Sequence, residues 1–203
     1  CDAFVSHSWS DDKEAKWEAL QRWRAKFIEA EGREPRLWID RCCVKQTNID
    51  IDLACLPFFL SGCKTLLVLG SESYLSRLWC IMELVTFAHM RGGCGQITIL
   101  PLESGEVEHE ESELIREGCL EFDVAECVCS HWHDKLRLLD VIRGAWGDEK
   151  GFSKVVRKLF CQVARRGSPA HSLAATSDDP LLSMDTTTSC SEASSSSASD
   201  YNG

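Results

Sequence analysis

The sequence has no excess of positive charge. Its 203 residues include 22 Lys and Arg against 32 Asp and Glu, which gives a formal net charge of -10. Nucleic-acid backbones and anionic membrane surfaces both favour proteins with a basic face. We therefore expect neither nucleic acid nor a membrane surface to be a main partner of this segment.

Long uninterrupted apolar runs are also missing. The most apolar stretch, Leu53 to Gly70, contains Pro57 and Lys64, whereas a transmembrane helix needs about 20 predominantly apolar residues. The sequence begins with Cys1 rather than Met and shows no signal peptide. We expect a cytoplasmic segment that is an excerpt of a longer protein.

Cysteine, in contrast, is abundant, with 12 residues. Small secreted proteins rich in disulfides have many cysteines, but they are poor in ordinary core residues, and this chain has long apolar segments and seven tryptophans. Cys42 and Cys43 are adjacent and do not form the C-x-x-C spacing of a redox pair. Reduced thiols in a cytosolic protein fit this pattern better.

The segment CVCSHWHD contains four soft metal ligands, Cys127, Cys129, His131 and His133. Alternate residues of an extended chain lie nearly 7 Å apart, whereas zinc ligands lie about 2.0–2.3 Å from one ion. Only tight folding would bring all four to one zinc ion. We therefore expect ordinary cysteines and a polar helix start here, and no metal site.

Strand and helix patterns alternate along the first four-fifths of the chain. The expected strands are short β-prone runs at Ala3–Val5, Arg36–Ile39, Thr65–Leu69, Ile97–Leu100 and Leu120–Val124. The expected helices have apolar residues at helical spacing, at residues 12–30, 53–60, 75–89, 134–145 and 152–164. This alternation predicts a three-layer, flavodoxin-like α/β fold whose five-stranded parallel sheet is flanked by helices.

The last part of the chain has a different composition. From residue 167 onward it consists mainly of Ser, Thr, Asp and Ala, with few large apolar side chains. Such a segment cannot bury enough apolar surface to offset its loss of conformational entropy on ordering. We expect one α/β domain at residues 1–166 and a disordered tail at residues 167–203.

Polar residues follow the first two predicted strands. In open parallel sheets, ligands bind at the carboxyl ends of the strands, near the point where the winding direction reverses. These positions hold Ser6, His7, Ser8, Trp9 and Asp40. Each also has a purely structural explanation, since a serine can bond to backbone at a strand end, Asp40 can cap a turn and Trp9 can pack.

Glu83 and Trp79 lie four residues apart in the helix that follows the third strand, so both project from one face. A carboxylate beside an indole suits a reaction with a cationic, sugar-like transition state, because the carboxylate stabilises the charge and the indole limits water. The alternative is that Glu83 is a surface or salt-bridged residue and that Trp79 belongs to the core.

Three segments of the chain resemble Toll/interleukin-receptor (TIR) domains. They are DAFVSHSWSDD at residues 2–12, KTLLVLG at 64–70 and SYLSRLWCIMEL at 73–84, and they look like the first strand, third strand and third helix of the family. The WC-x-x-E element is the most specific of these. Between them, LWIDRCCVKQTNI at residues 37–49 looks more like the fungal heterokaryon-incompatibility (HET) domain, which is regarded as TIR-like.

The resemblance implies a function. In TIR domains that cleave NAD, the glutamate of this helix is catalytic, which assigns that role to Glu83. NAD would be the substrate rather than a cofactor, and nicotinamide and an ADP-ribose product would be released. Trp79 or Trp9 would stack on a ring, and Ser6, His7, Ser8 and Asp40 would line the pocket.

A second class of function also remains open. Many TIR domains are non-catalytic interaction modules in signalling or innate immunity, acting by self-association or by assembly with other TIR domains. The loop after the second strand, which usually carries Pro-Gly in the family, has neither residue at Cys43–Asn48. A receiver-like domain fits less well, since it would need clustered acidic residues where Ser6, His7 and Ser8 stand.

Truncation after Arg166 tests the expected tail. Because that segment offers almost no apolar surface to bury, the shortened chain should melt within a few degrees of the full chain. Thermal unfolding of the two proteins, followed by circular dichroism, measures the difference. A larger fall in melting temperature would show that the tail docks on the domain.

Overall fold

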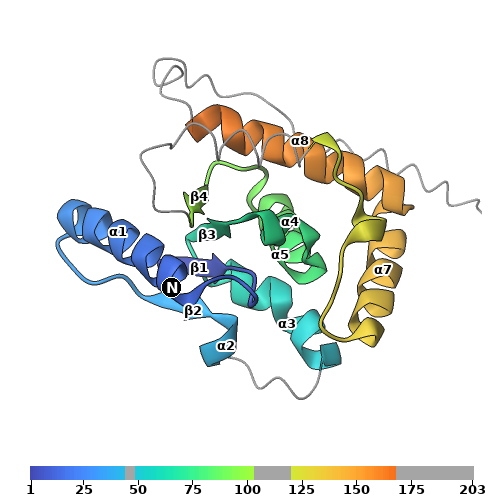
Figure 1. The fold of residues 1–203 in the computed structure, drawn as a ribbon, viewed down its shortest axis with the longest axis horizontal. Coiled ribbons are helices and arrows are strands. Elements are labelled where there is room, and N and C mark those ends of the chain that lie inside the picture. The colour runs from blue at the N-terminus through green and yellow to red at the C-terminus, as the bar shows by residue number, and fades with distance from the viewer. Residues whose placement is uncertain (44–48, 103–119, 168–203) are drawn as a thin grey trace, which may run out of the picture.

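Four parallel strands form one sheet in the order β2-β1-β3-β4, with helices on both of its faces (Figure 1). The computed structural model describes residues 1–43, 49–102 and 120–167. The strands are β1 (Ala3–Ser6), β2 (Leu37–Ile39), β3 (Thr65–Gly70) and β4 (Ile97–Pro101).

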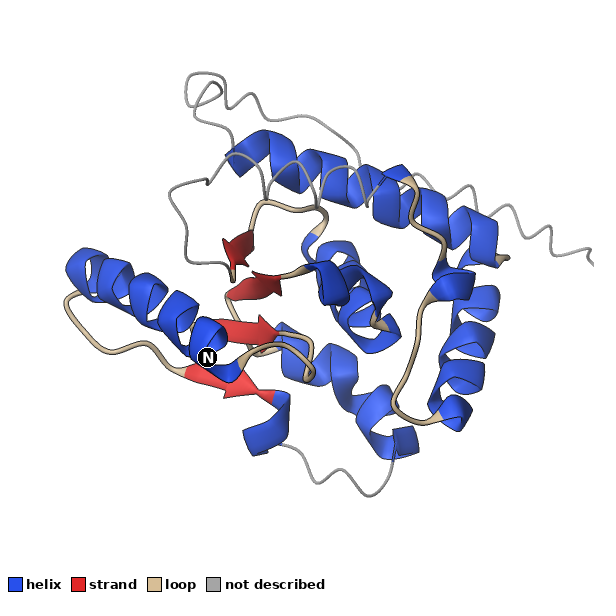
Figure 2. Ribbon diagram, viewed as in Figure 1, coloured by secondary structure: helices blue, strands red, loops and turns tan. Residues whose placement is uncertain are grey.

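The helices follow the strands along the chain, as Figure 2 shows by colour. They are α1 (Lys13–Glu31), α2 (Asp40–Cys43), α3 (Ile49–Ser61), α4 (Glu72–Ser76), α5 (Leu78–Arg91), α7 (Trp132–Trp146) and α8 (Glu149–Gly167), with a single 3-10 turn, η1 (Val124–Glu126), before α7. None of the helices in the described ranges is both long and apolar enough to cross a membrane.

The alternation of side chains along the strands creates two cores. Ala3 and Val5 of β1 face α1, together with Leu67 and Leu69 of β3. Phe4 points to the opposite face, where α3, α5, α7 and α8 form the larger core. Because successive strand residues point to opposite faces, every residue of β1 is buried by one layer or the other. The predicted three-layer α/β architecture is confirmed.

Helix α5 is the central element of the larger core. Its buried residues cover most sides of the helix, and they are Leu78, Cys80, Ile81, Met82, Glu83, Leu84, Val85, Phe87 and Ala88. A helix that is apolar all round has to be enclosed by other elements. Here α3, α4, α7, α8 and the sheet enclose it. Among these buried residues of α5, Glu83 is the one with an acidic side chain.

Stacked aromatic rings connect the start of the sheet to α3. Phe4 stacks on Trp38 of β2 with 4.3 Å between ring centroids, and Trp38 stacks on Phe59 of α3 at 5.1 Å. Such pairs contribute about 0.5–1.5 kcal/mol beyond the apolar area that they bury. They fix β2 and α3 against the same side of β1.

The number of strands differs from the prediction. The described residues contain four strands, and the expected fifth strand at Leu120–Val124 is wrong. Phe122 and Val124 do point alternately into the core, as the pattern required. Their backbone, however, bonds to side chains of α8: Ser153 Oγ accepts from the Val124 N–H at 3.0 Å, and Arg157 Nε donates to the Phe122 carbonyl at 2.9 Å. These two side chains provide the hydrogen-bond partners that a neighbouring strand would otherwise supply.

Two segments that lie outside the predicted helices are partly helical. The segment after β2 forms α2 at once, and α4, whose N-cap is Ser71, begins before the helix expected at residues 75–89. Most of the tail, residues 168–203, lies outside the described residues, as do residues 44–48 of the loop after the second strand and residues 103–119.

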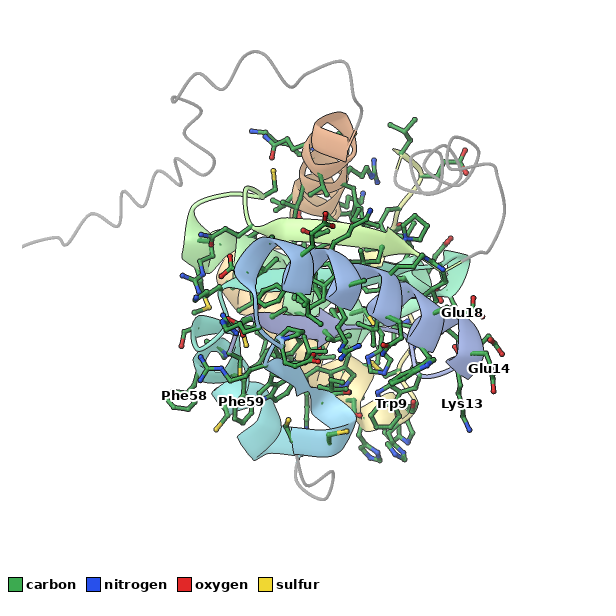
Figure 3. The ribbon with its side chains drawn as sticks, turned by 90° about the vertical axis from the view of Figure 1, so that its left-hand side faces the viewer. Trp9, Lys13, Glu14, Glu18, Phe58 and Phe59 are labelled. Atoms are coloured by element: carbon green, nitrogen blue, oxygen red, sulfur yellow. The ribbon has the colours of Figure 1, made fainter. Side chains whose placement is uncertain are left out.

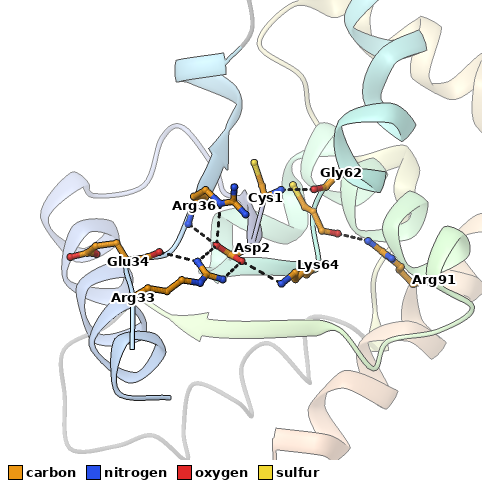
Figure 4. Close-up of polar contacts among 9 residues, drawn as sticks. Cys1, Asp2, Arg33, Glu34, Arg36, Gly62, Lys64 and Arg91 are labelled. Atoms are coloured by element: carbon orange, nitrogen blue, oxygen red, sulfur yellow. Dashed lines mark hydrogen bonds and ion pairs between the residues drawn. The ribbon is translucent and has the colours of Figure 1, made fainter. Parts of the chain in front are cut away.

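A charged cluster closes the amino-terminal end of the sheet (Figure 4). The Asp2 carboxylate is buried and accepts two hydrogen bonds from the Arg33 guanidinium, at 2.7 and 2.8 Å. It also accepts from the backbone N–H of Arg36 at 2.9 Å, and Lys64 Nζ lies 3.7 Å away. The Arg33 hydrogen bonds, above all, hold the pKa of Asp2 well below its ordinary value of 3.8. One carboxylate thus connects β1, the segment before β2 and the start of β3.

Asp2→Asn should destabilise the domain by about 1–3 kcal/mol, because a neutral amide accepts weaker hydrogen bonds than a carboxylate does. The loss stays in this range because the surrounding cations are exposed and water screens them. The depressed pKa implies that this stabilisation is present above pH 3.8 and is lost as the pH falls below that value. Urea unfolding at several pH values measures both effects.

Glu34→Gln provides the control for Asp2→Asn, since it removes an ion pair with Arg24 that is exposed and screened by water, and it should cost less stability than Asp2→Asn does. Equal losses for the two variants, or a gap that does not narrow in acid, would contradict the assigned role of Asp2.

Candidate functional site

The winding direction of the sheet reverses between β1 and β3. The chain passes from β1 to β2 on one side and then returns to β3 on the other side of β1. The carboxyl ends of β1 and β3 are therefore neighbours, and Ser6 pairs with Val68 near that edge. Ligands of open parallel sheets bind at such a point. The polar residues that follow these two strands form the candidate site.

Glu83 reaches this edge from α5. Its side chain lies beside the end of β1, where Ser6 Oγ is within hydrogen-bond distance of Glu83 Oε2, at 2.5 Å. Ser6 is fully buried and Glu83 is 8% exposed. The structure thus brings together two of the predicted site residues, which are 77 positions apart in the sequence. It places Glu83 in the interior, not on the surface of its helix.

Two residues that the sequence analysis did not single out complete this contact. Tyr74 of α4 is fully buried, and its hydroxyl lies 2.8 Å from Ser6 Oγ. The same hydroxyl donates to the backbone carbonyl of Cys80 at 3.1 Å. Tyr74 lies inside the SYLSRLWCIMEL segment, but a tyrosine next to apolar residues gives no sign of where its hydroxyl will point.

Burial changes the acid–base behaviour of Glu83. Removal of the carboxyl group from water raises its pKa to about 8, the Ser6 hydrogen bond lowers it by a smaller amount, and the nearby Asp40 charge raises it further. Burial disfavours the charged form of any carboxyl group. At neutral pH, Glu83 is therefore mostly protonated.

Trp9 and Asp40 form a second contact, on the outer side of the same edge. Trp9 Nε1 donates to Asp40 Oδ2 at 2.7 Å, and the indole is 38% exposed. Figure 3 shows Trp9 next to the first turn of α1, where Lys13 and Glu14 are labelled. An exposed indole with its N–H already paired presents a ring face on which a planar group can stack.

His7 lies between these two contacts. Burial lowers the pKa of His7, and the charge of Asp40 opposes that effect. The thiol of Cys80 donates to the His7 carbonyl at 3.4 Å, which attaches the loop after β1 to α5. His7 is therefore attached by its backbone to α5, and the charge of Asp40 acts on its ring.

The loop after β1 is fastened to the start of α4 by one carboxylate. Asp11 accepts from Ser71 Oγ at 2.8 Å and also from Ser73 Oγ. Ser8 is fully buried, its hydroxyl lies 2.8 Å from that of Ser10, and its carbonyl accepts from Lys16 Nζ at 2.9 Å. These bonds account for the polar groups of Ser8 without a ligand.

Trp79 has a different environment from the rest of the predicted site. It is half-buried and packs against the larger hydrophobic core. The helical spacing did predict that Trp79 and Glu83 share one side of the helix, but Trp79 is only partly buried whereas Glu83 is buried. This position agrees with the alternative that Trp79 is a core residue.

The described cysteines are all free thiols. Within the described ranges, no three His, Cys, Asp or Glu side chains are grouped in a way that could hold a metal ion. Cys127 is buried and its thiol donates to the Leu75 carbonyl at 3.4 Å. Burial raises the pKa of Cys127 to about 12 and that of Cys129 to about 11, which disfavours the thiolate form that binds zinc.

No protein-family model matches the chain, and no curated protein matches it. The resemblance of residues 37–49 to HET domains therefore stays a prediction without support from a family model.

One similar solved structure is entitled "Structure of the activated Roq1 resistosome directly recognizing the pathogen effector XopQ (TIR domains)". It is 16% identical to this chain, covers 81% of this chain and 83% of its own, and superposes with a TM-score of 0.45. A likeness at this level does not establish a shared family. The fold class rests on the strand order and the helices described above.

Glu83→Gln should change how stability depends on pH. The raised pKa means that the folded protein keeps a proton that the unfolded chain loses between pH 4.5 and about 8, so wild-type stability falls across this window. The glutamine amide does not titrate and can donate to Ser6. As the pH rises through that window, the free energy of unfolding of the variant should therefore increase relative to that of the wild type by up to about 1.4 kcal/mol per pH unit.

Chemical unfolding of both proteins at several pH values measures this gain. Glu29→Gln, at an exposed position of α1, makes the same substitution at the surface and serves as the control. A constant difference between wild type and Glu83→Gln from pH 5 to pH 8 would contradict the raised pKa.

Proposed function

We propose that this chain is a TIR-like domain that cleaves the bond between nicotinamide and ribose in NAD, with Glu83 as the catalytic residue. One observation carries the proposal. A carboxyl group without an arginine or lysine bonded to it within the described residues lies at the carboxyl ends of β1 and β3, beside Ser6. The resemblance of the WC-x-x-E element to NAD-cleaving TIR domains supports the same assignment.

The chemistry requires a negative charge at Glu83. As nicotinamide leaves, the ribose takes on oxocarbenium character, and a carboxylate close to it lowers the barrier by stabilising that positive charge. The ionised carboxylate would also accept hydrogen bonds from the ribose hydroxyls. The nicotinamide ring of NAD is cationic before the bond breaks, and a nearby cation favours the ionised form of a buried carboxyl.

Trp9 and Asp40 suit the recognition of a ring. The Trp9 indole is partly exposed and is held in orientation by its bond to Asp40. We propose that Trp9 stacks on a ring of the substrate, that His7 and Asp40 line the pocket, and that Ser8 shapes the loop from within. Ser6 acts through its hydrogen bond to Glu83. Trp79 contributes by packing against the larger hydrophobic core.

The alternative function is a non-catalytic module that acts by self-association or by assembly with other TIR domains. The burial of Glu83 favours this alternative, because only 8% of the residue is exposed and the Ser6 hydroxyl already bonds to its carboxyl group. The two functions differ in one measurable property, the release of nicotinamide. The resemblance also implies that activity needs self-association, so the assay should be run at high protein concentration and repeated on dilution.

If Glu83 is catalytic, Glu83→Gln should reduce nicotinamide release by orders of magnitude, because the amide cannot supply several kcal/mol of charge stabilisation. The wild-type rate should rise up to tenfold per pH unit below about pH 8 and level off above it, since only the ionised form acts. Chromatographic measurement of nicotinamide, with melting temperatures of the same preparations, tests both statements.

A fully active, stable Glu83→Gln protein would refute the catalytic assignment. Absence of nicotinamide release from concentrated wild-type protein across this pH range would instead favour the interaction module. Glu29→Gln again controls for the loss of one negative charge.

A further inference from the structure

The hydroxyl groups beside Glu83 pose a question of proton counting. Three oxygen–oxygen contacts connect four groups in a row: Glu83 to Ser6 at 2.5 Å, Ser6 to Tyr74 at 2.8 Å and Tyr74 to the Cys80 carbonyl at 3.1 Å. All four groups are buried. Ser6 and Tyr74 have one hydroxyl proton each, and a backbone carbonyl can only accept. Two protons cannot serve three contacts.

The missing proton can come only from the other end of the row. If Glu83 is protonated, its O–H donates to Ser6, Ser6 donates to Tyr74, and Tyr74 donates to the Cys80 carbonyl, so each contact has its own proton. If Glu83 is ionised, Ser6 donates to it, and the single proton of Tyr74 has to serve either Ser6 or Cys80. One contact is then left without a proton, which is unfavourable for buried oxygen atoms.

We propose that Tyr74 is a positioning residue that holds Glu83 in its protonated form, by accepting from Ser6 while donating to the Cys80 carbonyl. When Glu83 ionises, its proton leaves to water and Ser6 turns its own proton from Tyr74 to the carboxylate. Tyr74 therefore makes two hydrogen bonds next to neutral Glu83 and one next to ionised Glu83. The catalytic consequence rests on the proposed function, whereas the position of the proton does not.

One other charged group near Glu83 also disfavours its ionisation, and the remaining charges act on neighbouring groups. The charge of Asp40, at the start of α2, disfavours ionisation of Glu83, and any charge on Tyr74 or Cys80 is in turn opposed by Glu83. Farther out, Arg77 acts on Cys80, and Asp11 and Lys16 act on His7. Burial raises the pKa of Glu83, in agreement with the proton count, whereas a hydrogen bond donated by Ser6 to the carboxylate lowers it by a smaller amount. The proton count itself rests on the distances.

Tyr74→Phe keeps the buried ring and removes only the hydroxyl. It takes two hydrogen bonds from the neutral state and one from the ionised state, so the titration midpoint of Glu83 should fall by about 0.5–1 pH unit. This direction is informative, because general loosening of the structure would not be expected to favour a buried charge selectively. Carbon-13 NMR of the labelled glutamate carboxyl groups, with the Glu83 signal assigned by its loss in Glu83→Gln, measures the midpoint directly.

Two further variants show whether Tyr74 acts through Ser6. In a Ser6→Ala background, Tyr74→Phe should no longer move the midpoint, since the row of contacts is already broken. Ser153→Ala is the matched control: Ser153 is also buried, and its hydroxyl bonds to Val124 and Glu149 at a distance from Glu83. It should lower stability and leave the Glu83 midpoint unchanged.

An unchanged or raised midpoint in a folded Tyr74→Phe protein overturns the proposal. Should this variant not fold, the wild-type infrared spectrum decides: the protonated-carboxyl band that Glu83→Gln removes should be present at about pH 6 and absent at about pH 10. Absence of that band at about pH 6 overturns the proposal as well.

Activity separates this inference from the proposed function. If both hold, Tyr74→Phe should raise nicotinamide release at pH 7 several-fold and leave the rate well above pH 8 unchanged. A lowered midpoint in a protein that never releases nicotinamide supports the position of the proton and refutes NAD cleavage.

Discussion

The burial of one carboxyl group against the end of β1 is the constraint on which the candidate site depends. A carboxylate in the interior needs either a cation or a proton, because the free energy of removing an unpaired charge from water is several kcal/mol. Both solutions occur in this structure, one at each end of β1. Asp2, before β1, is paired with Arg33 and Lys64, whereas Glu83, beside the last residue of β1, contacts the hydroxyl of Ser6, which in turn contacts that of Tyr74.

Most of the fold could be predicted from the sequence, because alternation and helical spacing are local signals. Phe4 between Ala3 and Val5 already indicates a strand that is buried on both faces, and the structure divides these residues between two cores. The fifth strand could not be judged in this way. Phe122 and Val124 show the alternation of a strand, but the partners of their backbone are Arg157 and Ser153, which lie 35 and 29 positions later in the chain.

The candidate site was predicted in part. The rule that ligands gather at the carboxyl ends of strands selected Ser6, and the helix motif selected Glu83, so their contact joins two independent predictions. The burial of Glu83 and the role of Tyr74 could not be predicted, because both depend on how α4 and α5 pack against β1. Trp79 illustrates the reverse case. Its spacing from Glu83 was predicted correctly, but spacing alone does not show whether a helix position is exposed or buried.

The two ends of β1 should therefore respond to different properties of the solution. The Asp2 cluster depends on attraction between a carboxylate and cations that are themselves exposed, and such attraction weakens as dissolved salt screens it. The contacts from Glu83 to Tyr74 and Cys80 are buried and carry little net charge at neutral pH, so ionic strength affects them little. High salt loosens the amino-terminal edge of the sheet, and alkali loosens the edge that holds Glu83. Applied one at a time, the two conditions would therefore destabilise the two ends of one short strand separately.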